Sequence, residues 1–172
     1  NDHDELLDKK IDAAFQEFGL IDLIFIAHGM LPNQQSCEEN WDIVKESIQV
    51  NALSVIEICH KVTSKLAQQK NGMIAVISSV AGERGRQSNY YYGAAKGMLT
   101  IFLQGLRNRL YDKNIHILTI MPGFVESKMT ESFEKSFLWA KPTAVAQDII
   151  KSIDKKKCVL YTPWFWRCIM LT

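Results

Sequence analysis

Tyr92 and Lys96 are the pair of residues whose spacing points most directly to chemistry. They lie four residues apart in a segment expected to be helical, so they share one face of that helix. A free tyrosine has a pKa of about 10, and a nearby ammonium group lowers that pKa by stabilising the phenolate. This pair therefore predicts general acid–base chemistry, although the same spacing also occurs by chance beside a solvated lysine.

Two more polar residues, Ser79 and Asn51, fit the same chemistry. Ser79 follows an apolar run, thirteen residues before Tyr92, and its hydroxyl could bind a carbonyl oxygen; the alternative is a turn-capping serine. Ser78 is the less favoured partner. Asn51 stands in the middle of a long helix, where its amide needs a kinked backbone or an ordered water. Such a water could relay protons to Lys96, and the alternative is an amide on the shoulder of the helix.

Short and long apolar patterns alternate along the chain around these candidates. Short, almost wholly apolar runs predict buried strands at 21–26, 73–77, 115–121 and 158–161. Apolar residues three and four positions apart predict helices at 4–17, 36–66, 88–110 and 143–153. The second helix is expected to begin at a capping box, Ser36 with Glu39. Its apolar stripe consists of Trp41, Val44, Ile48, Ala52, Val55, Cys59, Val62 and Leu66.

This alternation predicts an α/β fold with a doubly wound parallel sheet, because helical crossovers join parallel strands. Ligands of such sheets bind at the carboxyl ends of the strands. The candidate site is therefore expected at residues 27–29, 78–82 and 122–125.

Composition excludes several other classes of protein. The 172 residues are 47% hydrophobic, and 20 Lys and Arg against 19 Asp and Glu give a net charge of +1. This argues for one globular domain and against nucleic acid as a partner. Four scattered cysteines favour a reducing compartment and a cytoplasmic location. No histidine spacing predicts a metal site, and no run of 18 apolar residues predicts a membrane span.

Four segments together resemble the short-chain dehydrogenase/reductase family: VNALSV at 50–55, ISSVAG at 77–82, YGAAK at 92–96 and MPGFVESKM at 121–129. The resemblance covers about residues 1–161. It implies a Rossmann-type sheet and hydride transfer between NADP or NAD and a carbonyl or alcohol, with NADP slightly favoured.

The resemblance also implies a role for each candidate. Tyr92 would donate the proton, Ser79 would anchor the carbonyl, Lys96 would tune Tyr92 and bind the nicotinamide ribose, and Asn51 would hold the relay water. Besides Tyr92 and Lys96, the expected cofactor-binding residues are Ala27, Gly29, Pro122, Gly123, Val125 and Ser127.

A finer resemblance rests on AGERGRQSNYYYGAAK, IAHGM and PWFWR. These segments look like the reductases of decaprenylphosphoryl-2-keto-erythro-pentofuranose and related cell-surface polysaccharide reductases. The implied substrate is a polyprenyl-phosphate-linked keto-sugar for cell-envelope synthesis. Another carbonyl substrate and a non-catalytic Rossmann-like scaffold are the alternatives.

The chain departs from the family pattern in two places. Ile26–Gly29 stands where the family usually has Asn-Asn-Ala-Gly, and His28 in it is expected to be a cofactor-facing loop residue rather than a base. No glycine precedes Gly19, so the glycine-rich pyrophosphate turn is missing. We therefore expect 1–172 to be a single partial domain without the first three strands, and a fragment of a longer polypeptide.

Two expectations concern partners. Residues 162–172 would begin an aromatic C-terminal extension. It would form a flap over the substrate pocket, a contact between copies, or a peripheral contact with the inner face of the membrane. A homodimer or homotetramer would pack through the 36–66 and 88–110 helices. There the small residues Gly93, Ala94, Ala95 and Gly97 would permit close approach, apart from those that face the cofactor.

Overall fold

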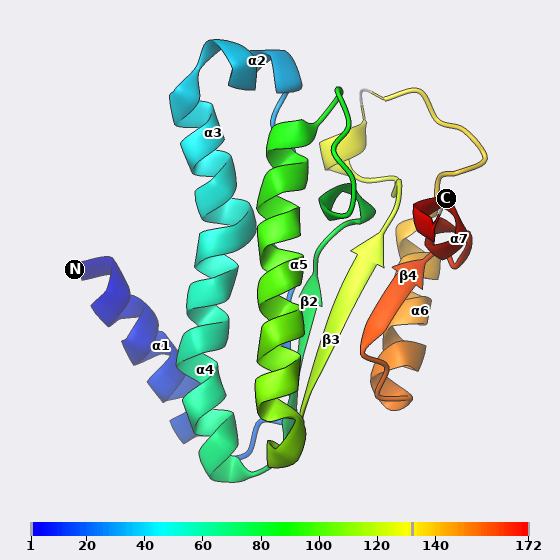
Figure 1. Ribbon diagram of the computed structural model, residues 1–172. Helices are drawn as coiled ribbons and strands as arrows, with labels where there is room; N and C mark the ends of the chain where they lie inside the picture. Colours follow the sequence, from blue (N-terminus) through cyan, green and yellow to red (C-terminus); the bar gives the residue numbers. More distant parts are fainter. Residues whose placement is uncertain (1, 132, 172) are drawn as a thin grey trace.

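Four parallel strands form one sheet whose spatial order follows the chain. They are β1 (Leu23–Ile26), β2 (Gly72–Ile77), β3 (Ile115–Pro122) and β4 (Val159–Thr162). The computed structural model describes residues 2–131 and 133–171 (Figure 1). Each apolar run in the sequence has become a strand, so the predicted α/β parallel sheet is confirmed.

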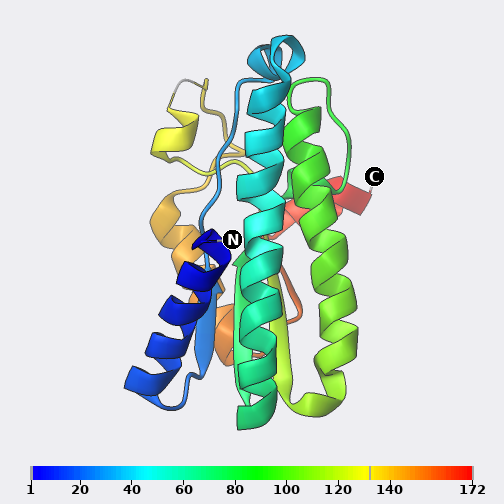
Figure 2. The ribbon, with the colours of Figure 1, turned by 90° about the vertical axis from the view of Figure 1, so that its left-hand side faces the viewer.

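Helices cover both faces of the sheet. Their bounds are α1 (Asp2–Phe18), α2 (Gln34–Glu39), α3 (Trp41–Ile48), α4 (Ser54–Gln69), α5 (Tyr90–Leu110), α6 (Pro142–Asp154) and α7 (Phe165–Leu171). Figure 1 shows α4 and α5 on one side of the sheet and α6 on the other. Figure 2 shows α1 beside α4, against which it packs.

The strand β2 carries the core on both faces. Its alternate residues Ile74 and Val76 pack with α4 and α5, while Met73 and Ala75 pack with α6. A strand buried on both sides reads as a continuous apolar run, which is why periodicity identified it. In the described part of the chain, β1 is an edge strand, and Leu23 and Phe25 on it are exposed.

The long predicted helix is interrupted, so the expected continuous helix over 36–66 is wrong. Asn33 caps α2 by accepting a hydrogen bond from the Ser36 amide at 3.0 Å, and Asn40 caps α3 by accepting one from the Asp42 amide at 2.9 Å. Ser36 therefore lies inside α2 and is not the cap of a capping box with Glu39. Asparagine is among the strongest N-cap residues, and two of them here define two separate helix starts.

A π-helical turn over Gln49–Leu53 joins α3 to α4. Across it the predicted apolar stripe is buried or half-buried from Val44 to Leu66. Trp41 is the exception: 62% exposed, it occupies the first turn of α3, just after the break at Asn40.

Three glycines set the distance between α5 and the turn that follows β2. A Cβ on Gly82 would lie 2.7 Å from the Lys96 carbonyl carbon and the Gly97 amide nitrogen, and a Cβ on Gly93 would lie 2.7 Å from the Ala81 oxygen. Gly93 and Gly97 thus pack against the turn at Ala81 and Gly82 of the same chain. This corrects the expectation that these two glycines serve an interface between copies.

This contact predicts opposite effects for two glycine substitutions on the same helix. Gly93→Ala forces α5 away from Ala81, and we expect it to lower the free energy of unfolding by about 2 kcal/mol. Gly105→Ala meets nothing within 4 Å and should raise that free energy by about 1 kcal/mol through helix propensity alone. Urea unfolding of both full-length variants tests this, and a Gly93→Ala protein as stable as the Gly105→Ala protein would contradict the close approach.

No helix in residues 2–131 or 133–171 combines the length and the apolar character needed to cross a bilayer.

Candidate functional site

A cavity of about 190 Å³ opens at the carboxyl ends of β2 and β3. Six residues predicted from the sequence line it: Ser79, Tyr92, Pro122, Gly123, Val125 and Ser127. They come from the turn after β2, the first turn of α5, and the last residue of β3 with the segment that follows it. The structure therefore brings together candidates from three distant parts of the chain.

Lys96 lies behind this cavity, at the centre of the fold. Its side chain is 2% exposed, its Nζ donates a hydrogen bond to the Ile77 carbonyl at 3.1 Å, and the same Nζ is 5.9 Å from the centroid of the Tyr92 ring. The predicted shared helix face is thereby confirmed. Burial lowers the pKa of Lys96 from 10.5 to about 8, because a desolvated ammonium group is disfavoured.

Tyr92 differs in one respect from its prediction. Burial raises its pKa above the ordinary value of 10.0, and a hydrogen bond with the Ser79 hydroxyl opposes that rise less strongly. We expected the lysine ammonium to lower this pKa, but the net shift is upward because burial is the largest cause. The Nζ of Lys96 also bonds to Ile77 and not to the phenol, which limits its effect on the phenolate.

Ser79 caps a turn and contacts the tyrosine at once. Its Oγ accepts a hydrogen bond from the Ala81 amide at 3.1 Å, and its hydroxyl lies near enough to Tyr92 to act on the pKa of the phenol. The turn-capping role is therefore confirmed, and the binding of a carbonyl oxygen stays a prediction. The Ser78 hydroxyl is instead buried and shared with Thr100 at 2.7 Å, which leaves it a structural residue.

Asn51 is fully buried in the π-helical turn. Its Oδ1 accepts from the Met30 amide at 3.0 Å, and its Nδ2 donates to the Met30 carbonyl at 2.8 Å and to the Ser47 hydroxyl at 3.2 Å. Of the predicted alternatives, the irregular backbone is the one found. The side chain braces the loop after β1, a role that the sequence pattern did not indicate.

The loop after β1 reaches this group through Gly29. A Cβ there would lie 3.0 Å from the Asn51 Oδ1 and 3.5 Å from the Lys96 Nζ, so glycine permits the close approach. Ala27 is exposed and does not line the cavity. His28 is paired with the Ser54 hydroxyl at 2.8 Å, and burial followed by the charge of Lys96 lowers its pKa.

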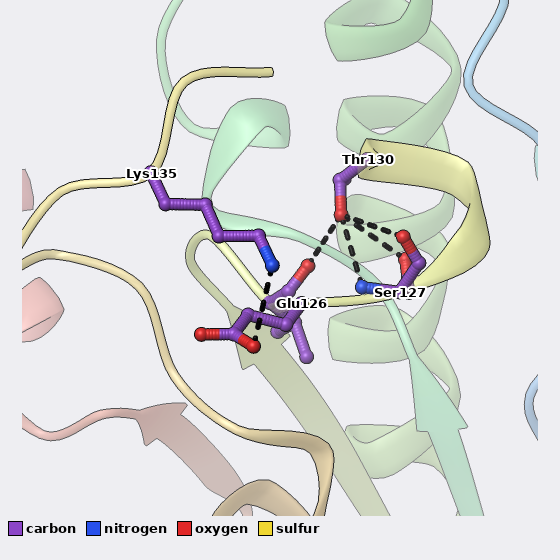
Figure 3. A network of polar contacts seen from close by, with 5 residues as sticks. Glu126, Ser127, Thr130 and Lys135 are labelled. Carbon is purple, nitrogen blue, oxygen red and sulfur yellow. Dashed lines mark hydrogen bonds and ion pairs between the residues drawn. The ribbon is translucent and has the colours of Figure 1, made fainter. Parts of the chain in front are cut away.

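The segment after β3 is held by its own hydrogen bonds (Figure 3). The Thr130 hydroxyl donates to the Val125 carbonyl at 2.7 Å and accepts from the Ser127 amide at 3.1 Å. Lys135 and Glu126 form an ion pair at 3.5 Å. Thr130 was not predicted, although its place three residues after Ser127 is typical of a cap.

The aromatic C-terminal residues pack beside the cavity. Trp166 of α7 is 2% exposed and occupies the space that a side chain on Gly123 would need, with the Phe124 ring edge-on at 5.3 Å. Trp164 is 74% exposed. The packing of Trp166 explains why residue 123 is glycine in this chain, and the flap stays a prediction.

A larger cavity of about 860 Å³ lies at the opposite ends of the strands, beside Asn71, Asn114 and Cys158. None of the predicted catalytic residues lines it, and ligands of parallel sheets bind at the carboxyl ends. In the described residues, no three His, Cys, Asp or Glu side chains are grouped so that they could hold a metal ion.

Comparison with known proteins finds a matching family and related oxidoreductases. The profile of the family described as short chain dehydrogenase matches residues 2–136. An uncharacterized oxidoreductase of Mycobacterium tuberculosis is 30% identical over 151 residues, which are 88% of this chain and 61% of that protein. A 3-oxoacyl-[acyl-carrier-protein] reductase of Chlamydia muridarum is 28% identical over 130 residues, which are 74% of this chain and 51% of that protein.

A short chain dehydrogenase from Burkholderia cenocepacia, solved in complex with NADP, shares the fold with a TM-score of 0.82 at 14% identity. The match covers 92% of this chain and 64% of that structure. The chain thus spans about three fifths of the length of the mycobacterial relative and of this structure. The profile match over most of the residues, on a four-stranded parallel sheet with flanking helices, shows that the chain belongs to the short-chain dehydrogenase/reductase family.

Proposed function

We propose that this chain is the catalytic part of an NAD(P)-dependent reductase that converts a ketone to an alcohol, with Tyr92 as the proton donor. One observation carries the proposal: Ser79 and Tyr92 line the same cavity, and the ammonium of Lys96 lies 5.9 Å from the centroid of the Tyr92 ring. A carbonyl oxygen placed there would meet two hydroxyl donors.

The residues present fit the nicotinamide end of a dinucleotide. Gly29 brings the backbone after β1 close to the buried Lys96 and Asn51, and the segment from Pro122 to Ser127 lines the same cavity as Tyr92. These residues would hold the group, which supplies a hydride when bound. NADP is the proposed form, supported by the Burkholderia cenocepacia structure in complex with NADP.

The protonation states suit reduction. A raised pKa keeps Tyr92 protonated at neutral pH, so the phenol can give its proton to the carbonyl oxygen as negative charge develops there. With a pKa of about 8, Lys96 is mostly charged at pH 7. Its ammonium then stabilises the phenolate that Tyr92 becomes after the transfer, because opposite charges attract strongly in a desolvated site.

The proposed substrate is a keto-sugar linked to a polyprenyl phosphate. Its support is the run from Ala81 to Lys96, which resembles the reductases of such compounds. A 3-oxoacyl substrate is the alternative, supported by the Chlamydia muridarum relative. Comparing turnover of the two ketone classes by the full-length protein separates them.

Removing the phenol hydroxyl tests the proton donor. We expect Tyr92→Phe in the full-length protein to lower the rate of ketone reduction at least about 100-fold, because a positioned general acid contributes that much or more. Tyr91→Phe, one residue away, is the matched control and should keep its activity. Circular dichroism should be unchanged in both. A Tyr92→Phe protein that keeps more than a few per cent of the wild-type rate would refute the assignment.

The lowered pKa of Lys96 makes stability depend on pH. Below pH 8 Lys96 is charged in both the folded and the unfolded chain, and the cost of burying that charge is fully present. Between pH 8 and 10.5 the unfolded chain binds the additional proton, so the contribution of Lys96 to stability rises with pH.

Lys96→Met lacks this ammonium group. We therefore expect the free energy of unfolding of the wild type, relative to that of the variant, to rise between pH 8 and 10.5. Urea unfolding of the cofactor-free proteins at several pH values measures the difference. The exposed substitution Lys45→Met is the control. Parallel pH profiles for the wild type and Lys96→Met would contradict the buried, desolvated ammonium.

We also propose a homodimer that packs through α4 and α5. Its support is the exposed apolar side chains of Leu53, Met98 and Ile101, the last of them 71% exposed. Met98 and Ile101 are three residues apart and share a side of α5.

A charge on this side of α5 should separate the copies. We expect Ile101→Glu to convert the full-length protein to a monomer in size-exclusion chromatography with light scattering. Ile150→Glu, at an exposed position of α6 on the other face of the sheet, should leave the dimer intact. A wild-type protein that is strictly monomeric would contradict the proposal.

A further inference from the structure

We propose that the cavity beside Tyr92 selects ketones that carry a negatively charged group, a carboxylate or a phosphate, and that Arg86 binds this group. The inference rests on the proposed reductase function and adds the class of substrate. It comes from two residues, Arg86 and Asn89, that line the same 190 Å³ cavity as Ser79 and Tyr92.

Arg86 is a cation without a described counterion. None of the ion pairs within 4.0 Å in the described residues includes it, and its side chain donates no hydrogen bond there. Its guanidinium carbon lies 5.8 Å from the ring centroid of the buried Trp166. This contact places the guanidinium over the ring, and its N–H donors remain available for a carboxylate or a phosphate, which guanidinium binds in a bidentate manner.

The acidic group nearest in sequence is occupied elsewhere. Glu83, three residues before Arg86, accepts a hydrogen bond from the Tyr161 hydroxyl at 2.5 Å. Arg84 on the same loop points its guanidinium at the Met170 carbonyl, 3.0 Å away. The loop between Ser79 and Tyr92 is thus fastened to the C-terminal residues at both positions, while Arg86 remains available to the cavity.

Asn89 adds a second requirement. Its side-chain Oδ1 is buried and has no hydrogen-bond partner in the described residues. An unsatisfied buried acceptor is costly, and a hydroxyl group on the substrate is a donor that would satisfy it. The two residues together favour an anionic ketone that also carries a hydroxyl group.

Two pairs of ketones that differ in charge test the inference in the full-length protein. Levulinate and methyl levulinate differ in a carboxylate, and dihydroxyacetone phosphate and dihydroxyacetone differ in a phosphate. We expect the anion of at least one pair to be reduced with a kcat/KM about tenfold or more above that of its neutral partner, since hydrogen bonds to charged groups contribute about 1.5–3 kcal/mol. The pair that shows the preference identifies the anion.

Three variants assign the preference to Arg86. Arg86→Met should raise KM for the anionic ketone about tenfold with little change in kcat, and should leave the neutral ketone unaffected. Arg86→Lys should recover part of the loss. Arg84→Gln removes an equal charge from the same loop and is the matched control. Equal reduction of charged and neutral ketones by the wild type would overturn the inference, as would an equal loss on both ketones in Arg86→Met.

A binding measurement separates this inference from the reductase proposal. Because Arg86 lies over Trp166, levulinate or dihydroxyacetone phosphate should change the tryptophan fluorescence of the wild type saturably, and Arg86→Met should lose the change. If no ketone is reduced but the saturable change is seen, the reductase proposal fails and the anion site stands. If neither anion gives a saturable change, the anion site is refuted whatever the turnover.

Discussion

The arrangement of the site depends on one backbone contact, between the turn at Ala81–Gly82 and the face of α5 that carries Gly93 and Gly97. A Cβ at Gly82 or Gly93 would meet backbone atoms at 2.7 Å. Ser79 begins that turn, and Tyr92 and Lys96 are the residues next to the two helical glycines. The contact therefore fixes the distance between the backbone at Ser79, which follows β2, and the backbone at Tyr92 on α5. The main chain thereby positions both side chains.

A desolvated ammonium is the second requirement of this arrangement. Lys96 is buried among the apolar residues of α5 and β2, where a charge is costly, and the Ile77 carbonyl and the Tyr92 ring are what it contacts. Burial lowers the pKa of Lys96 and raises the pKa of the Tyr92 phenol. Both side chains are shifted toward their neutral forms, and only the shift of Lys96, to a pKa of about 8, brings a titration closer to neutral pH.

Sequence periodicity was sufficient for the strands and for the helix faces, because both follow from apolar spacing that burial enforces. It missed the break at Asn40 and the π-helical turn, although Val44, Ile48 and Ala52 recur every four residues, which is wider than the 3.6 of an α-helix. Ser79, Tyr92 and Lys96 lie on the elements predicted for them, whereas Asn51 lies in the π-helical turn and not inside a continuous helix. The pKa of Tyr92 could not be read from spacing, because it depends mainly on how deeply the phenol is buried. Arg86 and Asn89 belong to no periodic pattern in the sequence. Their place in the cavity wall is known only from the structure.

The π-helical turn at Gln49–Leu53 has a consequence for how related genes can differ in length. Each residue of an α-helix turns the chain by about 100°, so deleting one codon in this turn would restore a regular helix and rotate everything on one side of it by that angle. Asn51 would then leave Met30, or the apolar stripe of α4 would leave the sheet. The single extra residue allows Asn51 to face Met30 while the apolar stripe of α4 faces the sheet. Deletions of one codon should therefore be selected against at these five positions more strongly than in the exposed turns.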